Sequence, residues 1–395
     1  MPADRSKPNG GPSGAPSEPS RKAARNHVPF GTRIAMAHGK QSRVRKRRLD
    51  ELEVVKTLGA GSAARVMLVR TTAREDSRPL EKPGALFAMK VFKKRALRRE
   101  LMYWEEHAER ARLSETPWHP FIAGLLDVFA DEKNVYEMLE FLPCGNLRVH
   151  LQRIGGRMDG PTATFYYANI VLGLQFLHGL GIIHRDLKPD NIILGGNGYL
   201  AITDFGHAKL DSASKDDSEW QALGTPYYMA PEIVTTGMPA RYRTFGVDWW
   251  ASGVILYELV TGEFPFDNYD EDGPNDETVV EELFEQIRYA DVPWPAEIPL
   301  GRQLQSIIER LLRKEPERRL HGDNGTLVKH PWLANVDWVR MGRQLYKAPY
   351  VPQAHRHETN WHTWRMPTED EIPGLPITDV PVMQQFDDRF FESED

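Results

Sequence analysis

Two short strings in the middle of the chain constrain its fold and chemistry more than any other feature. The first is HRDLKPDN at positions 184–191, and the second is DFG at positions 204–206, after a gap of 12 residues. Transfer of a terminal phosphoryl group requires an oriented hydroxyl and neutralised phosphate oxygens more than it requires covalent catalysis. Together the strings supply a proton acceptor, a cation and metal ligands at the spacing that this chemistry needs.

Each string contributes polar side chains to the predicted site. Asp186 can accept the proton of a substrate hydroxyl, and Lys188 can lie over the transferred phosphoryl group. Asn191 and Asp204 can hold magnesium. An isolated aspartate in a loop is usually a turn former, so the prediction depends on the combination.

Size and composition favour a soluble intracellular protein. The 395 residues suggest two or three domains, and a hydrophobic content of 41% supports a sizeable core. The sequence has no run of eighteen apolar residues, and its N-terminus has neither the apolar core of a signal peptide nor a glycine at position 2. The single cysteine, Cys144, excludes an internal disulfide framework and fits a reducing compartment. We therefore expect a location in the cytoplasm, the nucleus or both.

Charge is distributed unevenly along the chain. Residues 1–50 carry 12 Lys and Arg against 3 Asp and Glu, a balance of +9, whereas the remainder carries 38 against 53, a balance of −15. Residues 1–42 are rich in Pro, Gly, Ser and Ala, so we expect a disordered basic arm over residues 1–51. The run RVRKRR at 43–48 fits a nuclear-import signal, a docking arm for nucleic acid or an anionic membrane surface, or merely a solvated stretch.

Strand patterns precede helical patterns along the chain. The strand patterns lie at residues 53–58, 64–70, 86–92 and 135–142. The helical patterns lie at residues 94–113, 164–180 and 245–261. This order predicts an α+β fold, with a small sheet lobe beside a larger helical lobe. From about residue 335 onward we expect irregular structure.

A glycine-containing turn joins the first two predicted strands. Residues 58–66 read LGAGSAARV, and the two glycines allow backbone N–H groups to approach phosphate oxygens without a Cβ clash. Lys90, 29 residues after Gly61, would pair with the α- and β-phosphates. It needs a carboxylate on the following helix to hold its direction, and we choose Glu109. The predicted nucleotide-binding residues of this region are Leu58, Gly59, Ala60, Gly61, Ser62, Ala63, Ala64, Val66, Ala88 and Lys90.

Several further motifs resemble those of eukaryotic protein kinases. They are GTPYYMAPE at 224–232, DWW at 248–250 and LLRKEPERRL at 311–320. With the two strings above they cover about residues 52–333, and in combination they are very specific. Lys188 within HRDLKP resembles the serine/threonine type.

Within that family the chain resembles the AGC group. VDWWA at 247–251 is typical of the group, as is a tail that carries YKAPYVP at 346–352 and FDD at 386–388. The resemblance implies a two-lobed kinase fold with a small antiparallel sheet and one main helix in the first lobe. It implies an N-lobe at 52–139, a hinge at 140–145, a C-lobe at 146–333 and a docking tail at 334–395.

The same resemblance implies the ligands of the site. ATP and Mg2+ would be the cofactors, and backbone groups of Glu140 and Leu142 in the hinge would bind adenine. The partners would be proteins phosphorylated on Ser or Thr, together with a regulatory subunit or an upstream kinase.

Structural roles are also implied. Glu232 would pair with Arg319, and Asp248 would anchor the catalytic loop from a buried helix. A hydrophobic spine would link the lobes through Leu113, Leu125, His184 and Phe205.

The chain departs from the AGC pattern in its activation segment. The threonine that is phosphorylated in many AGC kinases is replaced by Gln221, and Glu105 stands where a contact to that phosphate would lie. We expect that Asp216, Asp217 or Glu219 partly replaces the phosphate, with Ser212, Ser214 and Ser218 as alternative phosphorylation sites.

Substrate preference follows from acidic positions. Asp190 and Glu258 match positions that receive arginines in AGC kinases that prefer basic substrates, and residues 263–285 add ten acids. Asn146 replaces a glutamate that often contacts an arginine three residues before the acceptor. We therefore expect a basic preference weighted to the arginine two residues before the acceptor, with a solvated acidic face as the competing interpretation.

Two function classes remain in competition. The first is an active serine/threonine kinase, supported by the presence of Lys90, Asp186 and Asp204. The second is a pseudokinase that binds nucleotide or partners as a scaffold, to which Ala64, Gln221 and Glu105 point. A phosphorylation assay separates them.

Overall fold

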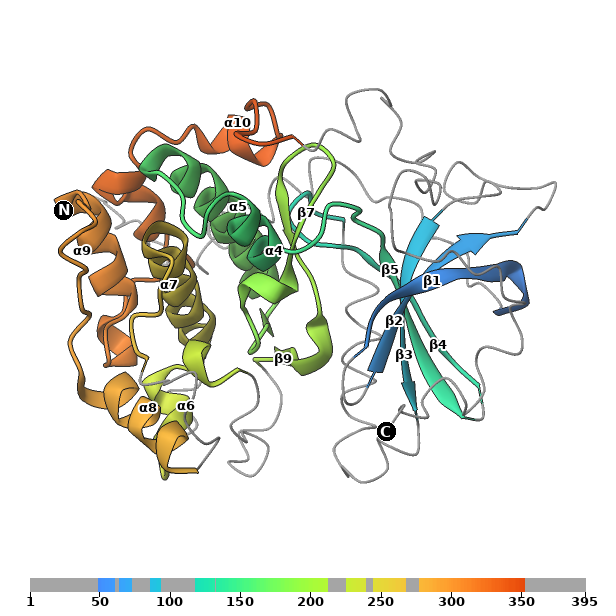
Figure 1. The fold of residues 1–395 in the computed structure, drawn as a ribbon, viewed down its shortest axis with the longest axis horizontal. Coiled ribbons are helices and arrows are strands. Elements are labelled where there is room, and N and C mark those ends of the chain that lie inside the picture. The colour runs from blue at the N-terminus through green and yellow to red at the C-terminus, as the bar shows by residue number, and fades with distance from the viewer. Residues whose placement is uncertain are drawn as a thin grey trace, which may run out of the picture.

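The computed structural model describes eight stretches of the chain. They are residues 49–60, 64–72, 86–93, 118–131, 133–211, 225–238, 244–267 and 277–351. These residues form a sheet lobe and a larger, mostly helical lobe (Figure 1), so the predicted two-lobed α+β fold is confirmed. Predicted features outside the described residues are the basic arm up to residue 48, the turn at 61–63, the helix at 94–113 with Glu109, residues 212–224 and the tail beyond 351.

The small lobe is one antiparallel sheet of five strands in the order β1-β2-β3-β5-β4. The strands are β1 (Leu52–Ala60), β2 (Ala64–Thr71), β3 (Leu86–Lys93), β4 (Leu125–Ala130) and β5 (Asn134–Glu140). The strand patterns predicted at β1, β2, β3 and β5 are confirmed. Strand β4 escaped prediction because LLDVFA is short and buries Asp127 in its middle, which hides the alternation.

The sheet has two unlike faces because successive side chains of a strand point to opposite sides. Met89 and Val91 of β3 are fully buried in the core of the small lobe, whereas Ala88 and Lys90 between them are only partly buried. Val66 of β2 lies directly opposite Lys90 in the register. Val66, Ala88 and Lys90 therefore share the face that points away from the small-lobe core.

Helices and short strands make up the large lobe. The helices are α4 (Leu147–Arg153), α5 (Gly160–Gly179), α6 (Pro231–Val234), α7 (Gly246–Thr261), α8 (Glu277–Tyr289), α9 (Arg302–Leu311) and α10 (Trp338–Gly342). The strands are β6 (Ile182–Ile183), β7 (Ile192–Leu194), β8 (Leu200–Ile202) and β9 (Lys209–Leu210).

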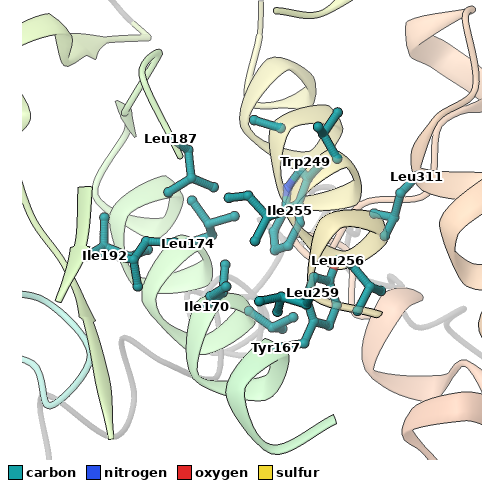
Figure 2. Packing of buried hydrophobic residues seen from close by; sticks show 14 of the residues in the cluster. Tyr167, Ile170, Leu174, Leu187, Ile192, Trp249, Ile255, Leu256, Leu259 and Leu311 are labelled. Atoms are coloured by element: carbon teal, nitrogen blue, oxygen red, sulfur yellow. The ribbon is translucent and has the colours of Figure 1, made fainter. Parts of the chain in front are cut away.

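Two helices, α5 and α7, form the centre of the large lobe. Figure 2 shows apolar side chains of both helices packed together, among them Ile170 and Leu174 from α5 and Ile255 and Leu259 from α7. Fully burying each such side chain contributes about 1.5–3 kcal/mol. The helices predicted at 164–180 and 245–261 are confirmed. Helix α5 begins earlier than predicted because Asp159 caps it, accepting a hydrogen bond from Thr162 N at 2.8 Å.

The strings HRDLKPDN and DFG lie between two small antiparallel pairs of strands. β6 pairs with β9, and β7 pairs with β8. The first string leaves β6 and ends in a 3-10 turn, Pro189–Asn191, which leads into β7. The second follows β8 and leads through a 3-10 turn, Phe205–His207, into β9. Strand pairing therefore fixes the position of one string relative to the other.

The start of the predicted tail packs against the large lobe. Tyr199 O–H donates to Tyr346 O, and the Tyr199 hydroxyl accepts from Tyr346 N, both at 2.8 Å. The expectation of purely irregular structure after residue 335 is wrong at α10, because Asp337 caps the helix by accepting from the N–H groups of Val339 and Arg340.

Candidate active site

Asp248 of helix α7 binds the backbone of the HRDLKPDN segment from the side of the buried core. Asp248 Oδ2 accepts a hydrogen bond from His184 N at 2.8 Å, and its Oδ1 accepts one from Arg185 N at 2.9 Å. Arg185 takes a left-handed backbone conformation, with a φ of 66°, and these bonds stabilise that turn. The predicted anchoring of the catalytic loop by Asp248 is confirmed.

A histidine that the sequence analysis missed supports this anchor. His178 of α5 lies between two carboxylates, with Nε2 2.9 Å from Asp248 Oδ2 and Nδ1 2.8 Å from Asp323 Oδ1. Burial alone would lower the pKa of His178, but the two aspartates outweigh it and raise that pKa to about 9. The ring is therefore a cation at neutral pH. No motif marks His178, because its partners lie 70 and 145 residues away.

Asp186 is buried and held by two predicted site residues. Asn191 Nδ2 donates to Asp186 Oδ2 at 2.9 Å and to its backbone oxygen at 2.8 Å. Lys188 Nζ lies 3.0 Å from Asp186 Oδ2 and also donates to Thr225 Oγ1 at 2.9 Å. The carboxylate is thus fixed in direction beside a cation, as a proton acceptor for an incoming hydroxyl requires.

The lobes meet at Lys90 and Asp204. Lys90 Nζ donates to Asp204 Oδ1 at 2.6 Å, across 114 residues of sequence. Burial alone would raise the pKa of Asp204, but Lys90 outweighs it and lowers that pKa to about 2. Asp204 itself has a left-handed backbone, with a φ of 60°, and accepts a hydrogen bond from Gly206 N at 3.2 Å.

The side chains predicted to hold magnesium suit that ion. Asp204 is an ionised carboxylate at neutral pH, since its pKa is about 2. The NH2 group of Asn191 points to Asp186, so its amide oxygen is directed the other way. Carboxylate and amide oxygens are the hard ligands that Mg2+ takes, usually with several waters and substrate phosphates. Asn191 and Asp204 therefore fit the predicted metal.

The segment predicted to bind nucleotide is described except for residues 61–63. Leu58, Gly59 and Ala60 end β1, and the side chain of Leu58 is exposed. Ala64 and Val66 begin β2, and Ala88 and Lys90 lie in β3 on one face with Val66. The described part therefore borders the face of the sheet on which Lys90 lies.

The predicted hinge connects β5 to α4. Glu140 N donates to Gly124 O at 2.9 Å, so an adenine at this residue would have to use the Glu140 carbonyl. Leu142 N has no hydrogen-bond partner within the described ranges. Burial raises the pKa of the Glu140 carboxyl, although a bond from Gly124 N opposes the rise.

A cavity of about 540 Å³ lies against the hinge. It is lined by Glu140 to Pro143, by Gly195 to Asn197 in the β7–β8 turn, and by Val351. Lys90, Asp186 and Asp204 are not among its lining residues, so it is separate from the centre formed by those side chains.

Two further structural contacts were implied by the motifs. Arg319 binds Glu232 through paired hydrogen bonds of 2.6 and 2.8 Å, and neither side chain is accessible to solvent. The rings of His184 and Phe205 meet edge to face with centroids 5.5 Å apart. The pairing of Glu232 with Arg319 is confirmed, as is the contact of His184 with Phe205. Leu113, also predicted for the spine, lies outside the described residues.

Family comparison agrees with this geometry. The family model of the protein kinase domain matches residues 52–333. The chain belongs to the protein kinase family. Its catalytic loop, its DFG turn and the pair between the lobes are therefore parts of a kinase domain.

Relatives place this kinase more narrowly. It is 36% identical over 336 residues to ribosomal protein S6 kinase alpha-2 of Mus musculus, covering 83% of this chain and 42% of that protein. It is 32% identical over 350 residues to protein kinase C delta type of Rattus norvegicus, covering 87% and 47%. It is 34% identical over 308 residues to a cAMP-dependent protein kinase catalytic subunit of Arthrobotrys oligospora, covering 77% and 54%.

These relatives confirm the predicted membership of the AGC group of serine/threonine kinases. The kinase spans about half the length of the curated relatives that it matches. Among the described residues, no helix combines the length and apolar character that a membrane crossing requires.

Proposed function

We propose that this kinase transfers the γ-phosphoryl group of Mg-ATP to Ser and Thr hydroxyls of protein substrates. One observation carries the proposal. Lys90 of the small lobe reaches Asp204 of the large lobe at 2.6 Å, while Lys188 and Asn191 hold Asp186 in the neighbouring loop. Lys90 is thus brought from 114 residues away to the metal-ligand candidate Asp204, which follows shortly after the loop that holds Asp186 and Asn191.

Each side chain has a distinct task in this proposal. Asp186 accepts the proton of the substrate hydroxyl as the hydroxyl oxygen attacks the γ-phosphorus, while the bond from that phosphorus to the β–γ bridging oxygen breaks and ADP leaves. Lys188 stabilises the negative charge of the transferred phosphoryl group. Lys90, whose ammonium group binds Asp204 at 2.6 Å, would exchange that carboxylate for phosphate oxygens of the nucleotide, which are anions as well. Asn191 and Asp204 would hold magnesium, which neutralises charge on the phosphate oxygens when bound.

Transfer of labelled γ-phosphate to a Ser/Thr peptide library tests the proposal. We expect the purified chain to transfer the label, and we expect this transfer to stop when EDTA removes magnesium. Lys90→Met and Asp186→Asn should each abolish most of the transfer, whereas Glu309→Gln, an exposed change on α9, should have no effect. Transfer that survives Asp186→Asn undiminished would contradict the assigned base.

The competing function is a nucleotide-binding scaffold. It predicts that ATP raises the melting temperature of the protein although no peptide is labelled. Measuring both quantities on one preparation separates the two functions, and adding an upstream kinase tests whether the chain needs phosphorylation despite Gln221.

Substrate context and location extend the proposal. Residues 51–395 carry a net charge of −15, which raises the local concentration of basic peptides. A regulatory subunit or an upstream kinase would be a further partner. The basic run at 43–48 would direct the protein to the nucleus, which fluorescence imaging of a variant without that run tests.

A further inference from the structure

One arginine binds both acids at which a substrate arginine was predicted to bind. Arg148 lies in the first turn of α4. Its Nε donates to Asp190 Oδ2 at 2.9 Å, and its NH1 group donates to Glu258 Oε1 at 2.7 Å. Its NH2 group donates to the Tyr228 hydroxyl at 2.6 Å, and that hydroxyl donates to Glu258 Oε2 at 2.6 Å.

This network leaves little unpaired negative charge to bind a ligand. The Glu258 side chain is 4% exposed, and both of its oxygens already accept a hydrogen bond. Burial alone would lower the pKa of Arg148, but Glu258, Tyr228 and Asp190 outweigh it and raise that pKa. The guanidinium is thus a permanent cation that uses all three of its nitrogens on this cluster.

The cluster lies beside the reaction centre. Asp190 precedes Asn191 in the same 3-10 turn, four residues after Asp186. Tyr228 ends the 3-10 turn Pro226–Tyr228, which directly follows Thr225, the residue that binds Lys188. Residues that flank an acceptor hydroxyl at Asp186 would therefore pass this cluster, and the 40% exposed carboxylate of Asp190 is its accessible side.

Asn146 does not restore an anion there. Its side-chain oxygen caps α4 by accepting a hydrogen bond from Val149 N at 3.0 Å. A neutral capping amide therefore stands where a glutamate was the expected arginine contact, so Asn146 adds no negative charge to the cluster of Arg148, Asp190 and Glu258.

We propose that Arg148 determines specificity by occupying the cation subsite of Asp190 and Glu258, which removes selection for arginine two residues before the acceptor. This inference rests on the proposed kinase function. It replaces the preference for arginine two residues before the acceptor that Asp190 and Glu258 alone predicted. A second guanidinium would meet a fixed positive charge, and it could enter only by displacing a partner with three hydrogen bonds. Basic residues at other positions still benefit from the acidic body.

Positional scanning of a Ser/Thr peptide library tests this assignment with three proteins. They are the unaltered chain, the variant Arg148→Met and the control Arg153→Met. The control removes the same charge at the exposed end of the same helix. We expect no preference for arginine over alanine at the second position before the acceptor in the unaltered chain and in Arg153→Met. Arg148→Met should gain a preference of about tenfold in kcat/KM, mainly through KM, because the freed acids then bind the substrate arginine.

Two further measurements keep the test decisive. Arg148→Gln retains hydrogen-bond donors for Glu258 and should show the same gain if Arg148→Met does not fold, as judged by its melting curve. Fluorescence anisotropy with arginine- and alanine-containing peptides measures the same preference as a ratio of Kd values without any phosphoryl transfer. A gain in binding without activity would support the subsite and contradict the proposed function.

Other outcomes overturn the inference. If the unaltered chain already selects arginine at that position, Arg148 does not block the subsite. If no Arg148 variant that folds gains selection by either readout, the two acids are not a substrate-arginine subsite at all.

Discussion

Charged groups in the core of the large lobe differ from those of the active site in what surrounds them. Glu232 and Arg319 have no solvent-accessible side-chain surface, and their bonds are saturated within the chain. At the active site, Lys90 and Asp204 are 15% and 34% exposed and hold each other by one contact of 2.6 Å. The first pair has no room for a third group, whereas the second can exchange its partner.

This difference separates charges that maintain the fold from charges that the proposed reaction would use. Removing one member of a sealed pair leaves a buried, uncompensated charge. Removing one member of an open pair leaves a charge that water or a ligand can reach. We therefore expect core substitutions to reduce stability, and site substitutions to reduce activity with little change in stability.

The largest expected effect is the loss of the proposed proton acceptor. Asp186→Asn keeps the shape of the side chain and should lower kcat by about 10²–10⁴-fold, because an amide cannot take the hydroxyl proton. Steady-state phosphorylation measures the rate, and a melting curve should show a stability close to that of the unaltered chain. A large drop in melting temperature would mean that Asp186 belongs with the structural charges instead.

Breaking the sealed pair should have the opposite signature. Glu232→Ala should lower the free energy of unfolding by about 3–5 kcal/mol, because Arg319 loses its partner in the core. The control is Glu53→Ala, which breaks an ion pair with Arg70 of similar length, 2.8 Å, at a partly exposed site on the sheet. That change should cost less than about 1 kcal/mol. Equal costs in urea unfolding would remove the distinction between sealed and open pairs.

The stability contributed by His178 and its two aspartates should depend on pH. The folded-state pKa of His178 is raised to about 9, against about 6.5 for an unperturbed histidine. Its charge therefore contributes fully to stability below about pH 6.5, and the contribution disappears as the pH rises through about 9. The total is on the order of 3 kcal/mol. Unfolding free energies of the unaltered chain and of His178→Gln should converge over this window, and a pH-independent difference would argue against a protonated ring.

The smallest expected effect concerns the hinge thiol. Burial raises the pKa of Cys144 to about 11, so almost no thiolate exists at neutral pH. Alkylation by iodoacetamide, followed by mass spectrometry, should be slow at pH 7.5 and should accelerate steadily toward pH 11. Labelling at pH 7.5 as fast as that of a free peptide thiol would show that the hinge opens this site to solvent.

Local patterns in the sequence determined much of the fold and the identity of the chemical groups. The alternation in β3 already separated Met89 and Val91 from Lys90. The spacing within HRDLKPDN already made Asp186, Lys188 and Asn191 neighbours, because all three lie within six residues of one loop. Such features follow from the periods of helices and strands and from short-range backbone geometry, both of which are written in consecutive residues.

Only the tertiary structure revealed the partners of Arg148 and His178. Arg148 lies 42 residues from Asp190 and 110 from Glu258, and no local pattern announces that its side chain fills their subsite. His178 between Asp248 and Asp323 is the same kind of case. The sequence gives the charge of each residue. Which residue pairs with it depends on helix packing and burial, and these depend on the whole lobe at once.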